Sequence, residues 1–212
     1  MAPSGHLGPR NALWLVSAAA ALAICLVAPR QAYAAPSPDQ CSPAVAVLKD
    51  VLSRRGHSSW PLVLGHSVTM AVTMARNAST SLAEPGYSPP RWAALPPDSA
   101  VPYVGPPSPA LMKRFAEHSP QSATECQTVR TLAVRRGIGL GGRTGPVRPW
   151  RRPNRVTTLN LTSAVTSDDG LEALVYMDSV SGPLTGSGQV LLLRRKSGER
   201  WRLVGGLGLW VS

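Results

Sequence analysis

The sequence predicts an α+β domain in which an N-terminal helix and two short helices pack on a curved antiparallel sheet. Three observations indicate this class. Apolar residues recur at helical spacing from Val45 to Leu52, and they alternate with small or polar residues from Leu62 to Arg76, as in a half-buried strand. From Val156 onward, short alternating stretches separated by turn residues are typical of a four-stranded meander.

Composition limits the classes of protein that are possible. The chain has 212 residues, of which 43% are apolar, and a formal net charge of +11. The apolar share is too high for a disordered chain, and three cysteines are too few for a disulfide-rich miniprotein. Only one long apolar run is present, which excludes a protein with several membrane spans.

Residues 1–34 have the organisation of a secretory signal peptide. Arg10 precedes an apolar run of 17 residues, Ala12–Ala28, and the triplet Ala32–Ala34 supplies the small residues of a signal-peptidase site. At about 1.5 Å per residue the run spans roughly 25 Å, which is less than the ~30 Å core of a bilayer. An uncleaved anchor is therefore the less favoured alternative. We expect cleavage, a periplasmic or secreted protein, and a single domain over 35–212 without a transmembrane segment.

Removal of this segment leaves 20 basic and 11 acidic residues, a net charge of +9, and two cysteines, Cys41 and Cys126. An even pair in an exported chain predicts one disulfide bond. Two buried thiols are the alternative. The bond would stabilise the fold by about 4–5 kcal/mol, because it restricts the unfolded chain.

The first helix is expected to begin at Ser42 and Pro43, because Ser caps free N–H groups and Pro is tolerated at the first helical position. Gly56 is a suitable residue to end it. The preceding residues, 35–40, are expected to be mobile.

Ser108 and Pro109 repeat this start at the second helix, and Ser119 and Pro120 repeat it at the third. A disulfide with Cys41 requires the third helix to pack near the first. Its apolar face consists of Ala123, Cys126, Val129 and Leu132.

The alternating segment Leu62–Arg76 is long for one strand, so a bend near Gly65 or a tight hairpin is an alternative. His66 shares its apolar face. We expect it to be a core histidine bonded to a backbone carbonyl, and the alternative is a residue of an active site.

A proline-rich insert follows at 85–109, with nine prolines. Such a segment forms neither a helix nor a central strand, so an extended, polyproline-like chain is expected. Tyr87, Trp92 and Tyr103 lie within it. They either fix the insert to the domain surface or contact a partner.

The segment 135–155 contains seven Arg and five Gly and no acidic residue, which predicts a loop or a disordered excursion. Its guanidinium groups are candidates to bind phosphates or carboxylates, and in an exported protein the partner would be a polyanion or an anionic membrane surface. The alternative is a solvated loop. The candidate ligand-binding residues are Arg135, Arg136, Arg143, Arg148, Arg151, Arg152 and Arg155.

Four strands are expected in the meander. The unbroken apolar run Val190–Leu193 indicates a central strand that is buried on both faces. Turn residues separate the strands at Asp168–Gly170, at Gly182 and Pro183, and at Ser197 and Gly198.

The stretch from Ala173 to Asp178, the run Leu191–Arg195 and the strand that starts at Trp201 resemble the closing sheet of the SnoaL-like (nuclear transport factor 2-like) cone fold. In that family a polar turn often precedes a strand that begins with Trp and a basic residue. The resemblance covers about 40 residues and carries over no catalytic residue. In its general features the chain also resembles exported bacterial proteins.

The sequence holds no established catalytic motif. It lacks G-x-S-x-G with a later His, it lacks H-E-x-x-H, and the spacing of His57, His66 and His118 matches no common zinc site, so no metal or cofactor is expected. Glu172 and Asp178 lie on one face of a strand. They suit either general acid–base chemistry or an outward polar face.

Two functions stay open. The first is an exported, non-enzymatic binding domain, monomeric, for an anionic ligand. The second is a small-molecule enzyme with a site in the concave mouth of the sheet, near His66 or Asp178. Salt-dependent anion binding that is lost on deletion of 135–155 would support the first. A polar pocket that joins His66 to an acid would support the second.

Overall fold

The computed structural model describes residues 35–55, 61–66, 92–95, 105–118, 121–141, 156–182 and 184–211. All of them belong to one compact unit, Ala35–Ser212. The signal-peptide prediction for 1–34 lies outside the described residues. The helices are α2 (Pro38–Arg54), α4 (Pro109–Glu117) and α5 (Gln127–Arg135), with a short 3-10 helix η2 (Ala123–Glu125). The strands are β1 (Leu62–Gly65), β2 (Ala93–Ala94), β3 (Gly139–Leu140), β4 (Thr157–Leu161), β5 (Val165–Thr166), β6 (Glu172–Gly182), β7 (Thr185–Arg194) and β8 (Arg202–Val211).

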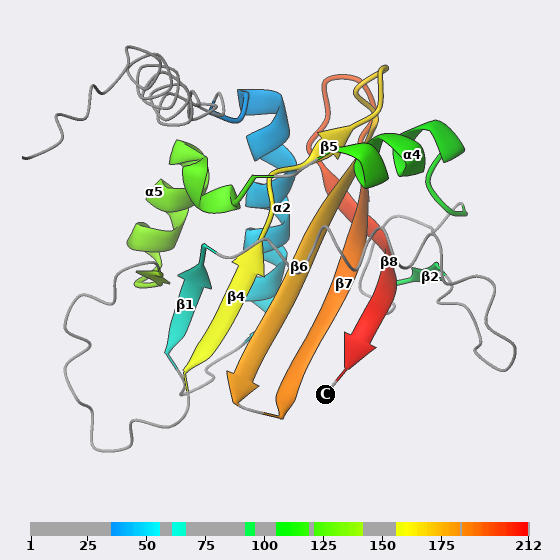
Figure 1. Cartoon of the computed structure of the whole chain (residues 1–212). Coiled ribbons are helices and arrows are strands. Elements are labelled where there is room, and N and C mark those ends of the chain that lie inside the picture. Colours follow the sequence, from blue (N-terminus) through cyan, green and yellow to red (C-terminus); the bar gives the residue numbers. More distant parts are fainter. Residues whose placement is uncertain are drawn as a thin grey trace, which may run out of the picture. The chain divides into compact units, whose positions relative to one another are not determined.

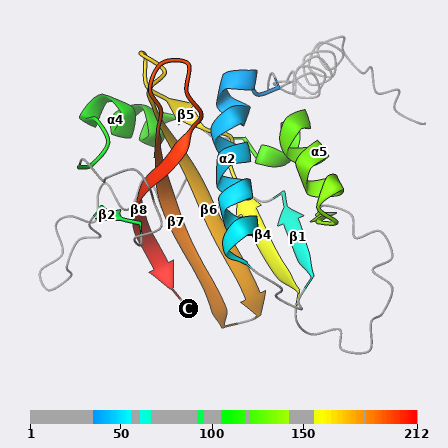
Figure 2. The ribbon, with the colours of Figure 1, turned by 180° about the vertical axis from the view of Figure 1, so that it is seen from behind.

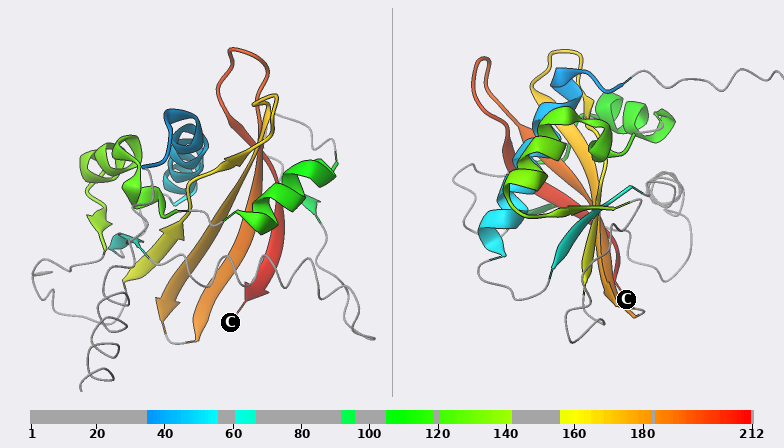
Figure 3. Two further views of the ribbon diagram at one scale, coloured as in Figure 1. Left: turned by 45° about the horizontal axis from the view of Figure 1, so that its top comes forward. Right: turned by 90° about the vertical axis from the view of Figure 1, so that its left-hand side faces the viewer.

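One mixed sheet organises the domain, with the strand order β2-β8-β7-β6-β4-β1-β3 and β5 beside β6 (Figure 1). Helices α2 and α5 lie on one face, called the first face here, and α4 lies on the other, the second face (Figures 2 and 3). The predicted α+β class and the C-terminal meander are confirmed.

Each face of the sheet has its own apolar core. On the first face, Val47 and Leu48 of α2 pack with Val129 of α5 against Val175 and Leu191. On the second face, Leu111 and Phe115 of α4 pack against Leu174, Tyr176 and Leu192. The predicted central strand is confirmed, since Val190 to Leu193 are all at most 2% exposed and alternate between the two cores.

The expectation of a wholly antiparallel sheet is wrong, because β1 pairs in parallel with both β3 and β4. Val63 lies opposite Gly139 on one side and opposite Thr158 on the other. Alternation of side chains fixes which residues face the core, but it carries no information on strand direction. Parallel neighbours need a long crossover, and the long chain segments between β1 and these two strands supply it.

Helix α2 begins five residues before the predicted start. Ser37 is its N-cap and forms a capping box with Gln40, and Pro38 takes the first turn. The Ser-Pro pair at residues 42 and 43 therefore lies inside the helix, where the proline supplies no N–H for the fourth carbonyl before it. The expected mobile lead-in is wrong for residues 38–40, which are helical.

The second helix begins at Ser108 as predicted, since its hydroxyl accepts from the N–H of Leu111. The third helix begins later than predicted. Ser122 caps the short helix η2, and α5 starts at Gln127. The predicted start at Ser119 and Pro120 lies outside the described residues.

The expected disulfide is present between Cys41 and Cys126, whose Cα atoms lie 5.6 Å apart. It links the first turns of α2 to the residue that precedes α5, and both cysteines are buried. None of the described helices combines the length and the apolar character that crossing a membrane requires.

The prediction of a loop over 135–155 is wrong at its N-terminal end. Arg135 is the last residue of α5, Ile138 is buried, and Gly139 and Leu140 form the edge strand β3. In the proline-rich insert, Ala93 and Ala94 pair with Gly206 and Gly205 at the other edge. Trp92 packs against the second-face core, which supports its expected role in fixing the insert. Tyr87 and Tyr103 lie outside the described residues.

Candidate functional site

A cavity of about 330 Å³ lies between the C-terminal end of α2 and the first face of the sheet. Its apolar lining comes from α2, from the five strands β1, β4, β6, β7 and β8, and from the residue that follows β2. Its rim is polar and includes two arginines. The apolar residues are Val51, Leu62, Leu95, Leu159, Met177, Leu191 and Leu203, and the polar ones are Asp50, Arg54, Arg55, Thr157, Ser179 and Gln189.

The cavity forms because α2 contacts the sheet less closely toward its end. Ala44, Val47 and Leu48 are fully buried, whereas Val51 and Leu52 are only half-buried. The strands β6 and β7 continue beyond the end of α2. Ser179, in this part of β6, has a side chain too small to fill the space between the helix end and the sheet. The space is therefore left between a helix end and a flat apolar floor.

The charges at the rim favour an anion. Arg54 donates its Nε–H to Asp50, with a nitrogen–oxygen distance of 3.0 Å, one turn earlier on α2. With Arg55, the lining holds two positive charges and one negative charge. The C-terminus of a helix carries partial negative charge, so an anion would be held by the guanidinium groups and not by the backbone. Such a cavity suits a ligand with an apolar body and a small anionic group.

Two of the seven predicted anion-binding arginines are described. Arg135 and Arg136 lie at the end of α5, and both are exposed. The other five, Arg143, Arg148, Arg151, Arg152 and Arg155, lie outside the described residues, so the anion-binding loop stays a prediction. Sequence reasoning missed the arginines of the cavity. Their signal was a basic pair at the end of an amphipathic helix, which equally describes a solvated helix end.

The expectation that His66 is a core residue is wrong. Its side chain is 58% exposed, and its Nδ1 lies 2.7 Å from the hydroxyl of Thr124. Its Nε2 lies 3.6 Å from a carboxylate oxygen of Glu125, which is also exposed. The strand β1 ends one residue before His66, so the alternation continues where the core has already stopped. This is a surface contact and not the enclosed polar pocket that an enzyme site would need.

Asp178 is the most buried carboxylate of the described residues, at 6% exposure. Its Oδ1 accepts from Nδ2 of Asn160 at 2.7 Å, and the Tyr176 hydroxyl also interacts with it. Burial raises the pKa of Asp178, and burial likewise raises the pKa of Tyr176 to about 12. Nε1 of Trp210 donates to the Tyr176 hydroxyl at 3.3 Å. Asp178 and His66 have different partners, so the structure does not join the two predicted residues.

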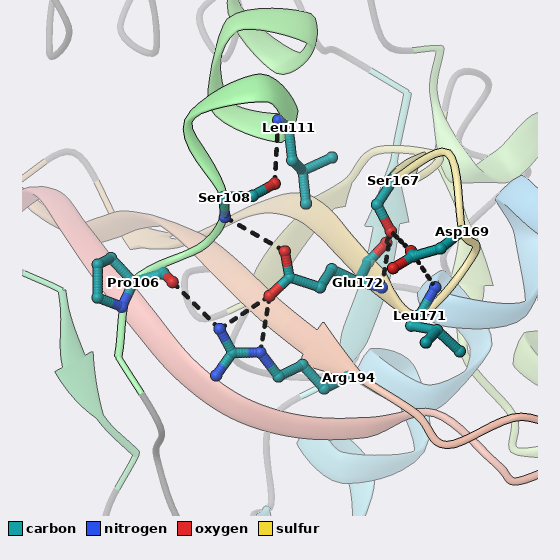
Figure 4. A network of polar contacts seen from close by, with 8 residues as sticks. All are labelled: Pro106, Ser108, Leu111, Ser167, Asp169, Leu171, Glu172 and Arg194. Carbon is teal, nitrogen blue, oxygen red and sulfur yellow. Dashed lines mark hydrogen bonds and ion pairs between the residues drawn. The ribbon is translucent and has the colours of Figure 1, made fainter.

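Glu172 holds α4 to the sheet (Figure 4). It accepts from Nε of Arg194 at 2.8 Å and from the backbone N–H of Ser108, the N-cap of α4, at 3.2 Å. Arg194 in turn donates to the carbonyl of Pro106 at 3.1 Å. Asp178 lies six residues along the same strand, roughly 20 Å away, so the two carboxylates do not form an acid–base pair. Neither belongs to an outward polar face, because Asp178 is buried and Glu172, which is 18% exposed, is paired with Arg194.

In the turn beside Glu172, the Ser167 hydroxyl and the N–H of Leu171 both donate to Asp169 (Figure 4). These two hydrogen bonds lower the pKa of Asp169. The predicted turn role of this residue is thus confirmed. Within the described parts of the chain, no three residues among His, Cys, Asp and Glu lie close enough to hold a metal ion. His57, one of the three histidines considered for zinc, lies outside them.

No protein-family model, no curated protein and no solved structure matches this chain. The resemblance to the SnoaL-like cone fold therefore stays a prediction. What the fold and the site define is a small α+β domain with a disulfide and an open cavity beside its first helix.

Proposed function

We propose that this chain is an exported, non-enzymatic binding domain that holds a small anionic ligand in the cavity beneath the end of α2. The observation that carries the proposal is the combination of an apolar floor with two arginines at the rim. The cavity volume of about 330 Å³ lies within the range of known small-molecule sites, about 300–1,000 Å³. Among the described residues, the lining contains no cysteine or histidine, and its one carboxylate is paired with Arg54.

Export is supported by the signal-like segment 1–34 and by the disulfide, because such bonds persist in oxidising compartments. The periplasm or the medium is the proposed location. The net charge of +9 that remains without residues 1–34 would keep anionic ligands near the protein, and seven of the positive charges lie in 135–155. The domain is proposed to act as a monomer without a cofactor.

The experiment uses the purified disulfide-bonded protein and the apolar anion 8-anilinonaphthalene-1-sulfonate, whose fluorescence reports binding. Ser179→Phe places a large side chain into the cavity from a half-buried position. We expect the affinity for the probe to fall at least about tenfold, the scale of one lost apolar contact surface. The melting temperature should stay close to that of the wild type.

The matched control is Ser197→Phe, in the exposed turn between β7 and β8 at the other end of these strands. It should leave the affinity for the probe unchanged. Equal affinity in the wild type and Ser179→Phe would overturn the proposal, because the probe would then bind elsewhere.

A second candidate function rests on Asp178, since a buried carboxyl group with a raised pKa suits proton donation. In that case the chain would be an enzyme with its site on the second face. Asp178→Asn separates the two functions. It should abolish any turnover of a substrate found by screening, and it should leave binding of the probe to the first-face cavity unchanged.

A further inference from the structure

We infer that the ligand of this cavity is a straight-chain amphiphile with a carboxylate head, whose head lies at Arg54 and whose chain crosses the floor toward β8. This inference rests on the proposed function and names the class of ligand. Three features of the cavity lead to it: its length, the glycines at its far end, and the charges at its near end.

The floor is long and narrow. Its apolar side chains come one from each of five neighbouring strands, β1, β4, β6, β7 and β8, and they are Leu62, Leu159, Met177, Leu191 and Leu203. Five strands about 4.8 Å apart give a band roughly 19 Å long. A volume of about 330 Å³ holds about eleven groups of the size of a water molecule, and a methylene group is of similar size. A chain of about ten carbons fills this volume. A straight chain follows a long band better than a round, branched or multi-ring body does.

Glycines leave the far end of this band open. A Cβ atom on Gly206 would meet Gln189, Leu191 and Leu95 at 3.5–3.7 Å, and all three line the cavity. A Cβ atom on Gly208 would meet nothing within 4 Å. Because Gly206 and Gly208 carry no side chain, the end of a chain can lie above them. Leu95, beside the edge strand β2, covers it from the side.

The near end carries the charges. Arg54 is 40% exposed and uses Nε for Asp50. A guanidinium group has further N–H donors, and a carboxylate can accept hydrogen bonds from them. The lining has a net charge of +1, from Arg54, Arg55 and Asp50. A carboxylate head neutralises that charge, whereas a cationic head adds to it.

The test measures the affinity of straight-chain carboxylates of about six to about sixteen carbons, by displacement of the fluorescent anion. We expect the affinity to be highest near about ten carbons. Gly206→Val fills the far end, and its Cβ contacts are ordinary ones that should not disturb the fold. The preferred chain should become shorter by about three carbons, roughly the volume of the added side chain.

The head is tested by two substitutions of opposite sign. Arg54→Gln reduces the net lining charge to zero and should weaken carboxylate binding about tenfold, the scale of a charge-assisted hydrogen bond. Asp50→Asn increases the positive charge and should strengthen binding several-fold. The alcohols of the same chain length should respond to neither. Arg130→Gln, an exposed arginine on α5, is the control and should change nothing.

Each failure has its own meaning. If alcohols and carboxylates bind equally well and respond equally to both substitutions, the carboxylate head is wrong, while the binding function stands. If no chain displaces the probe, although Ser179→Phe still prevents probe binding, the straight chain is wrong. If the probe itself ignores Ser179→Phe, the proposed function fails together with this inference.

Discussion

Asp178 shows how the burial of one carboxyl group makes the stability of this protein depend on pH. Its carboxylate accepts a hydrogen bond from the side-chain amide of Asn160. It also lies beside the hydroxyl of Tyr176, a fully buried residue. Burial disfavours the charged form, so the pKa of Asp178 is raised. In the unfolded chain the pKa of an aspartate is about 3.9. Between these two values the native state binds more protons than the unfolded state, and stability falls as the pH rises.

The first prediction concerns this pH dependence. Asp178→Asn keeps the shape and the acceptor for Asn160 but removes the buried charge, so it should be more stable than the wild type at neutral pH. The difference should be absent below about pH 3.9 and should grow as the pH rises toward the native pKa of Asp178. Denaturant unfolding over this range measures it. Asp169, whose lowered pKa gives the opposite trend, is common to both proteins and cancels.

Asp178→Ala provides the contrast. It leaves the Asn160 amide without its acceptor and should destabilise the fold by about 1–3 kcal/mol. If both variants were equally destabilised at neutral pH, the buried charge would not be the cause of the effect.

At the scale of elements, the start of α2 shows that local sequence signals alone do not determine where a helix begins. Two Ser-Pro pairs lie five residues apart, and both satisfy the rules for a helix start. The first pair is the cap, because Gln40 completes a capping box with Ser37. Propensity rules do not rank two such pairs. The tertiary contact decides, since the earlier start places Cys41 within the helix and opposite Cys126.

The second prediction compares these two serines. Ser37→Ala should lower the free energy of unfolding by about 1 kcal/mol, because it removes an N-cap. Ser42→Ala should change it by no more than about 0.5 kcal/mol, in the stabilising direction, because alanine is the better helix former. Urea unfolding of both variants decides. The reverse order would move the helix start to Ser42.

The third prediction concerns the attachment of α4. Glu172→Ala removes the carboxylate that pairs with Arg194 and accepts from the cap of α4. The side chains of Arg194 and Glu172 are 22% and 18% exposed, so the cost should be about 2–3 kcal/mol, below the range for a fully buried pair. Lys113→Ala breaks the exposed pair with Glu117 and should cost at most about 0.5 kcal/mol. Similar values for the two variants would contradict an attachment role.

At the scale of the whole molecule, the disulfide joins parts of the chain that are 85 residues apart. The fourth prediction is that its reduction, or the double substitution Cys41→Ser and Cys126→Ser, lowers the free energy of unfolding by about 2–5 kcal/mol. Denaturant unfolding with and without a reducing agent measures the loss. The doubly substituted protein should not respond to the reducing agent, and a response would point to another cause.

The α+β class, the meander and the disulfide were predictable because each depends on local patterns or on a simple count. Val190–Leu193 and the turn at Asp169 show this for the strands. The parallel pairing of β1 was not predictable, because a strand that alternates reads the same in either direction.

The cavity was not predictable for a different reason. It depends on where α2 stops relative to β6 and β7, which is a property of packing and not of any residue in it. Arg54 and Arg55 had a signal, but the same pair of arginines ends many solvated helices. The prediction that His66 lies in the core was wrong because the length of β1 determines where the core ends, and β1 ends before this residue.

The two ends of α2 are held differently, and this has a mechanical consequence. One end is fixed by a covalent bond at Cys41, while Val51 and Leu52 near the other end are only half-buried. A helix that is covalently fixed near its start is displaced most easily near its other end. Weakly packed segments also open at the lowest free energy. The less buried end of α2 contributes Val51 and Arg54 to the lining of the cavity. A ligand that binds in the cavity therefore contacts the part of α2 that is displaced at the lowest free energy.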